Sequence, residues 1–113
     1  MNAIDRIRSA RAEIAAAEAE LLGDRAPAVA ALAHLFNDMF SDSELRRGLR
    51  YYFPNVAAEL PGESVSPREV VDSAVRGLLF SGASAASLRP WLVSERPRRV
   101  AEIDTVLAKW GAP

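Results

Sequence analysis

The sequence predicts an all-α protein, a compact antiparallel bundle of about six short helices preceded by an N-terminal helix. Apolar residues recur every three or four positions along most of the chain, whereas alternating runs bounded by Asn-Gly or Asp-Gly are absent. Serine and proline residues typical of helix starts precede several of these apolar segments. The 113 residues suit one domain, which we divide into a helix over residues 1–23 and a bundle over residues 24–113.

The first predicted helix covers residues 1–22, which are rich in Ala, Glu and Arg, and it is expected to stop at Gly23 and Asp24. Its cations come early and its anions late, the reverse of what the helix dipole favours. Antiparallel pairing with a second copy would place opposite charges together, so we expect an oligomerisation or linker element here. The residues concerned are Arg6, Arg8, Arg11, Glu13, Glu18 and Glu20.

Two helices are predicted between Pro27 and Pro54. The first buries an apolar stripe formed by Val29, Leu32, Leu35, Phe36, Met39 and Phe40. A capping box formed by Ser41 and Glu44 starts the second, which Pro54 must end because proline lacks the amide proton. The second helix is expected to bury Leu45, Leu49, Tyr52 and Phe53 and to turn Arg46, Arg47 and Arg50 outward.

Further helices are predicted after a short helical turn over residues 55–60 and a loop over residues 61–64. Ser66 and Glu69 resemble a second capping box, and the helix they start is expected to bury Val71, Ala74, Val75, Leu78 and Leu79 and to stop at Gly82. Residues 84–95 form the next helix, whose first turn we expect to be irregular or late because of Pro90. The last helix begins at Pro97, ends at Gly111 and buries Val100, Ile103, Val106, Leu107 and Trp110.

Composition excludes several classes of function. The net charge of −1 provides no general attraction to nucleic acid or to anionic membranes. Cysteine is absent, which removes disulfides, thiolate metal sites and thiol catalysis. Charged residues throughout residues 1–22 argue against a signal peptide or a membrane span there, so we expect a cytoplasmic protein.

Candidate catalytic residues are few. His34 is the only histidine, and its helical phase places it opposite the apolar stripe, where we expect solvent. Trp91, Trp110 and Tyr52 lie on core stripes, and Gly48 and Gly77 lie inside helices, where glycine suggests close approach of a neighbouring element. The sequence therefore predicts no enzyme, no metal and no cofactor.

Arginine clusters are the main candidates for a binding surface. Arg46, Arg47 and Arg50 form a compact patch on one helix, and forked guanidinium groups suit carboxylates, which favours an acidic protein partner over nucleic acid. A second cluster at the start of the last helix opposes the helix dipole, which favours a binding role over a stabilising one. The predicted protein interface comprises Arg46, Arg47, Arg50, Glu59, Glu63, Arg96, Arg98 and Arg99.

Residues 35–109 resemble a bacterial effector-associated domain of the death-fold-like kind. The likeness rests on four segments: residues 35–40, which end in Phe40, residues 41–50 with their Leu-Arg-Arg sequence, residues 70–75, and residues 92–97 with Arg96 and Pro97. It implies a six-helix bundle that couples sensors to effectors in prokaryotic immunity or conflict systems by pairing with like domains. Because such domains are usually fused to an effector, it also implies a standalone adaptor or a piece of a longer protein, which forms a homodimer, a higher oligomer or a complex with a like helical domain.

Two alternatives remain open. A helix-turn-helix protein would insert Arg46, Arg47 and Arg50 into a DNA groove from a helix over residues 43–53, although the near-zero net charge argues against it. A chorismate-mutase-like enzyme is suggested by residues 4–8 and 18–25. Its active site needs several convergent cations, including a lysine, and the only lysine is Lys109.

Overall fold

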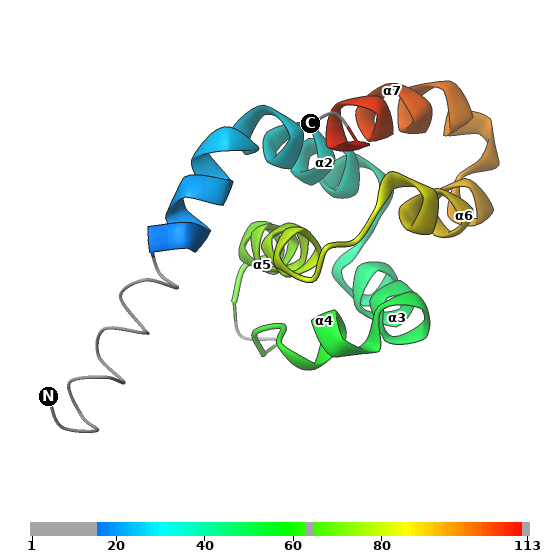
Figure 1. Ribbon diagram of the computed structural model, residues 1–113. Helices are drawn as coiled ribbons and strands as arrows, with labels where there is room; N and C mark the ends of the chain where they lie inside the picture. The colour runs from blue at the N-terminus through cyan, green and yellow to red at the C-terminus, as the bar shows by residue number, and fades with distance from the viewer. Residues whose placement is uncertain (1–15, 63–64, 112–113) are drawn as a thin grey trace, which may run out of the picture.

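A computed structural model describes residues 16–62 and 65–111 as an all-α bundle with no strand in those ranges. Helix α2 (Ala26–Met39) is followed by α3 (Asp42–Tyr52), the short α4 (Pro54–Ala58), α5 (Pro67–Phe80) and α6 (Ala85–Glu95). A 3₁₀ turn, η1 (Pro97–Arg99), leads into α7 (Val100–Gly111). Helix α2 packs on α5 and α7, α6 packs on α7, and α3 packs on α4 and α5 (Figure 1). The predicted fold class is confirmed.

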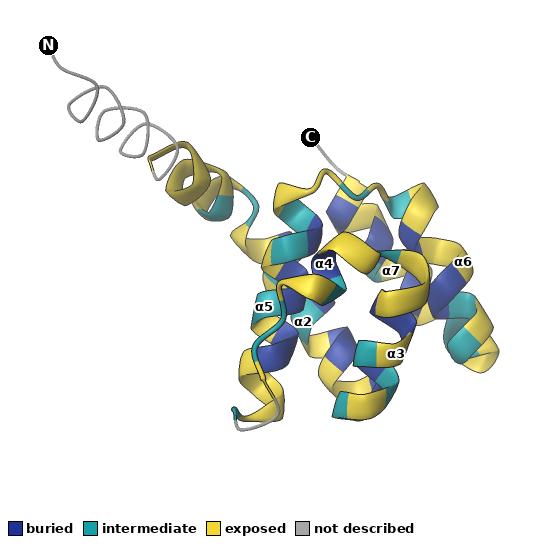
Figure 2. Ribbon diagram, turned by 90° about the horizontal axis from the view of Figure 1, so that it is seen from below, coloured by how far each residue is buried: buried dark blue, intermediate teal, exposed yellow. Residues whose placement is uncertain are grey.

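The N-terminal helix, described from residue 16 to residue 24, projects from the bundle in both views (Figures 1 and 2). The chain does not leave the helical path at Gly23 and Asp24 as predicted, but passes through a turn at Arg25 into α2. The amide of Arg25 donates to the carbonyl of Leu21 at 3.0 Å, and the amide of Val29 donates to the carbonyl of Arg25 at 2.9 Å. The Arg25 guanidinium also donates to the carbonyl of Trp110 in α7. These bonds hold the projecting helix in a fixed direction.

The centre of the core is the indole ring of Trp91, which has no exposed surface. The rings of Phe36 and Phe40 lie 5.4 and 5.2 Å from it, and Phe53 lies at 6.0 Å. Tyr52, predicted to be buried, remains 37% exposed, because it is the last residue of α3 and only its inner face covers Trp91. Further predicted core residues are only half-buried, at the edges of their helices, namely Val29, Phe53, Leu79, Val100 and Val106.

Two glycines mark close contacts, as predicted. A Cβ atom on Gly48 would lie 2.4 Å from Nε1 of Trp91, and one on Gly77 would lie 2.9 Å from Cγ1 of Val56. The α3 and α6 helices therefore approach at Gly48, and α4 and α5 approach at Gly77.

Several helix ends follow the predicted signals, although the last helix, predicted to begin at Pro97, begins at Val100 after the 3₁₀ turn η1. Ser41 and Glu44 form the predicted capping box, whereas at α5 only half of the second box is present, with the Ser66 hydroxyl accepting from the Glu69 amide. The third box, which Ser84 and Ser87 form at α6, was not predicted because its reciprocal acceptor is serine instead of glutamate or glutamine.

The first turn of α6 is regular despite Pro90. The prediction of a late or irregular start was wrong, since the helix begins at Ala85 and contains the proline. At the end of α5 Gly82 adopts a φ of 76°, and the amide of Ala83 donates to the carbonyl of Leu78 at 3.0 Å. This left-handed stop confirms the prediction for Gly82.

Candidate protein-interaction surface

The three arginines of α3 divide into one engaged and two free side chains. Arg46 was expected to point outward, but only 12% of its side chain is exposed, because Nε donates to Oδ2 of Asp42 at 3.0 Å and Nη2 donates to the carbonyl of Gly62 at 3.3 Å. The i, i+4 spacing from Asp42 explains the first contact. Arg47 and Arg50 are exposed and have no hydrogen bond or ion pair with another described residue. The predicted patch of three cations is therefore a patch of two.

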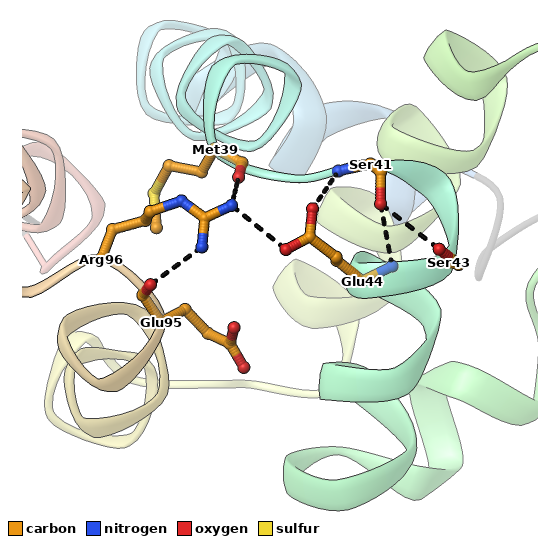
Figure 3. Close-up of polar contacts among 6 residues, drawn as sticks. All are labelled: Met39, Ser41, Ser43, Glu44, Glu95 and Arg96. Atoms are coloured by element: carbon orange, nitrogen blue, oxygen red, sulfur yellow. Dashed lines mark hydrogen bonds and ion pairs between the residues drawn. The ribbon is translucent and has the colours of Figure 1, made fainter.

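The second arginine cluster, at η1, mostly holds the bundle together. Arg96 donates to the carbonyls of Met39 and Glu95 and to Oε2 of Glu44, at 2.6, 2.9 and 3.1 Å (Figure 3). Its guanidinium also lies 6.0 Å from the ring centre of Phe40. These contacts join α2, α3 and α6, so Arg96 has a structural role in the bundle, and the interface role predicted for it stays a prediction.

The two arginines that follow differ in the same way. Arg99 is bound to Glu102, with Nε 2.9 Å from Oε2, and lies 3.9 Å from Asp38 at the end of α2. Arg98 is exposed and has no hydrogen bond or ion pair among the described residues. Arg98 is therefore the member of this cluster whose charge has no partner among the described residues.

The carboxyl group of Glu44 has a strongly shifted pKa. The pKa of its carboxyl falls from 4.5 to about 2, mainly because the carboxylate accepts the Ser41 amide, and further because it accepts Arg96 and the Ser41 side chain lies close. Hydrogen bonds to a carboxylate stabilise the charged form. Through Arg96, Glu44 joins α3 to the junction between α6 and η1.

Of the two acidic residues of the predicted interface, the structure describes Glu59, which has no hydrogen bond or ion pair with either arginine cluster among the described residues. Glu59 lies beside an open hollow of about 560 Å³ between α4 and α5, which Arg76 and Phe80 also line. Glu63 lies outside the described residues, as do Arg6, Arg8, Arg11 and Glu13 of the predicted self-pairing helix and residues 4–8 of the chorismate-mutase alternative.

Exposed aromatic residues are the part of the surface that the sequence analysis missed. Tyr51 is 80% exposed beside Arg47 and Arg50, and Phe80 is 40% exposed at the end of α5. The exposure of Tyr51 could have been predicted from its position on the helix, because Tyr51 lies opposite the buried Leu45 and Leu49 on α3. We call the surface formed by Arg47, Arg50 and Tyr51 the α3 patch.

Several other predictions concern single residues and sites. His34 is exposed, as expected, with Nε2 lying 3.5 Å from Oδ2 of Asp38, and Trp91 and Trp110 are buried. Across residues 16–62 and 65–111, no group of three His, Cys, Asp or Glu side chains is placed to hold a metal ion. Over the same ranges, none of the helices has both the length and the apolar character needed to cross a bilayer.

Comparisons with protein families, curated proteins and solved structures found no match to this chain. The likeness to effector-associated domains therefore rests on the sequence segments alone. What the geometry provides is an exposed surface on α3 with two cations and an aromatic ring, a combination suited to carboxylates and apolar groups of another macromolecule.

Proposed function

We propose that this protein is a non-enzymatic interaction module that pairs with a copy of itself or with a like helical domain on a sensor or effector protein. The proposed setting is a prokaryotic immunity or conflict system in the cytoplasm. The resemblance of residues 35–109 to effector-associated domains supports this setting, and the all-α bundle is compatible with it.

The α3 patch is the observation that carries the proposal. Arginine and tyrosine are enriched in the energetically important parts of protein interfaces, and Arg47, Arg50 and Tyr51 stand exposed on one side of α3. The opposite side of α3 is committed to the core through Leu45, Leu49 and the close contact of Gly48 with Trp91. A partner can therefore bind the exposed side without disturbing the bundle.

A double charge reversal tests the proposal. Arg47→Glu with Arg50→Glu is expected to abolish self-association, or capture of a like domain, in sedimentation velocity. The free energy of unfolding should change by no more than about 0.5 kcal/mol, because both side chains are exposed. Arg46 is excluded from the variant, since its loss would break contacts within the chain.

The matched control is Arg68→Glu with Lys109→Glu, which makes the same change in net charge on α5 and α7. Both residues are exposed, and neither has a hydrogen bond or ion pair with another described residue. The control should associate like the parent protein. Equal association of the two double variants would contradict a role for the α3 patch, and binding of duplex DNA that only the α3 variant loses would favour the nucleic-acid alternative.

A further inference from the structure

The N-terminal helix carries an exposed stripe that its own bundle does not cover. Glu20, Leu21 and Asp24 lie on one side of this helix, since they are spaced by one and by three residues, and all three are exposed. Leu22, in contrast, is half-buried and lines a small hollow against Val29 and α5. The helix therefore presents one side to its own bundle and the acidic, leucine-containing stripe to the surroundings.

This stripe complements the α3 patch in both spacing and charge. Counted backwards from Asp24, Leu21 and Glu20 lie three and four residues away. Counted forwards from Arg47, Arg50 and Tyr51 lie at the same distances of three and four residues. In an antiparallel alignment with this register Asp24 lies opposite Arg47, and the neighbouring pair Leu21 and Glu20 lies opposite the neighbouring pair Arg50 and Tyr51. Because successive residues of a helix are only about 1.5 Å apart along its axis, Glu20 can reach the guanidinium of Arg50 and Leu21 can contact Tyr51. Residues 16–24 contain three acidic residues and no basic residue, whereas the α3 patch contains two cations and no anion. Antiparallel alignment also pairs the two helix dipoles favourably.

The apolar surfaces agree with this pairing. The described residues expose four large hydrophobic side chains, and three of them are Leu21 on the N-terminal helix and Tyr51 and Tyr52 at the end of α3. A projecting helix of about this length gains little stability in water without packing. Contact with the α3 patch would cover the exposed leucine and the exposed tyrosine together.

Within one chain the two surfaces do not meet. The N-terminal helix leaves the bundle on the side of α2 and α5, and α3 lies across the bundle from it in both views (Figures 1 and 2). Hydrogen bonds through Arg25 to Leu21, Val29 and Trp110 fix the direction of the projecting helix. A second copy of the chain is therefore the source of the helix that reaches this surface.

We infer that the α3 patch binds the N-terminal helix of a second copy, antiparallel, through the stripe of Glu20, Leu21 and Asp24. The inference rests on the proposed function and specifies its partner. It joins two unlike surfaces, so a twofold dimer contains the contact twice.

Cross-linking tests the contact directly, because the 113 residues of the sequence include no cysteine. Leu21→Cys in one tagged population and Tyr51→Cys in another are mixed and treated with a short bismaleimide. We expect a covalent heterodimer, measured by intact mass, at a yield several-fold above that from Leu21→Cys mixed with Ala101→Cys. Both tested positions and the control position on α7 are exposed, so the substitutions leave the core intact.

A charge exchange provides the second measurement. Glu20→Arg with Asp24→Arg, and separately Arg47→Glu with Arg50→Glu, should each weaken self-association by about tenfold or more, as expected for the loss of exposed ion pairs and their replacement by like charges. Mixing the two variants should restore association, now as a heterodimer, because the reversed charges are again opposite.

The outcomes separate this inference from the proposed function. Association that depends on Arg47 and Arg50, without the Leu21 to Tyr51 cross-link and without an effect of the Glu20 and Asp24 reversals, would overturn the inference and leave the proposed function standing. A cross-link that forms only within one chain of a Leu21→Cys, Tyr51→Cys double variant would also overturn it. A protein that neither self-associates nor captures a like domain would overturn both.

Discussion

Neighbouring charged residues of α3 are used in opposite ways. Glu44 and Arg46 bond to Ser41, Arg96, Asp42 and Gly62, so their charges are engaged in contacts within the chain. Arg47 and Arg50 have no such contacts among the described residues, and Tyr51 is exposed beside them. The comparison shows that the function of an arginine cluster depends on which elements fold against it.

An aromatic ring against the buried face of α3 should contribute far more to the free energy of unfolding than a ring on its exposed face. Trp91→Ala removes an indole on which α3 packs, and we expect a loss of about 3–5 kcal/mol in the free energy of unfolding, because a cavity replaces a fully buried ring. Tyr51→Ala should change it by no more than about 0.5 kcal/mol. Urea denaturation followed by circular dichroism measures both, and equal losses would contradict the division of α3 into two faces.

Gly48→Ala tests the contact between α3 and Trp91 by adding a single methyl group. Gly48→Ala places a carbon 2.4 Å from Nε1 of a ring that has no room to withdraw. Overpacking of this kind costs about 1–3 kcal/mol, of which the better helix propensity of alanine recovers up to about 1 kcal/mol. We expect a net loss in thermal and urea stability.

The control for this substitution is Gly23→Ala, in the projecting helix, where no atom lies within 4 Å of the added carbon. Propensity alone acts there, so stability should stay the same or rise slightly. Increased stability of both alanine variants would contradict the close contact between Trp91 and α3.

Glu44→Gln is expected to have the smallest effect on stability of these substitutions, and the effect should depend on pH. The pKa of Glu44 is about 2 in the folded protein and 4.5 as the ordinary value, so the carboxylate stabilises the fold fully above about pH 4.5 and loses that contribution as the pH falls toward 2. Urea midpoints of the parent protein should fall over this window by more than those of Glu44→Gln, and the difference between the two should vanish at the acid end.

The guanidinium of Arg96 sharpens this test. In an Arg96→Met background one of the hydrogen bonds that lower the pKa of Glu44 is absent, so the difference caused by Glu44→Gln should be smaller at neutral pH. A difference of unchanged size would show that Arg96 and Glu44 do not act together.

The local signals in the sequence determined where most helices begin and end. Ser41 with Glu44, Pro67 and Gly82 act within a few residues of the chain, so their effects do not depend on distant packing. The apolar stripes likewise determined the all-α class and most of the core, including Trp91. Pro90 was misjudged because the rest of α6 packs well enough to retain a helix around it.

Tertiary structure decided most of which charged residues are available. Spacing along a helix accounts for the pairs of Arg46 with Asp42 and of Arg99 with Glu102. The contacts of Arg46, Arg96 and Arg99 with Gly62, Met39 and Asp38 come from other parts of the chain, and composition or spacing does not predict them. It also decided that the N-terminal helix points away from α3, since the bonds of Arg25 to both neighbouring turns and to α7 fix its direction. A helical pattern is local, whereas the pairing of a guanidinium group is set by whatever the fold brings beside it.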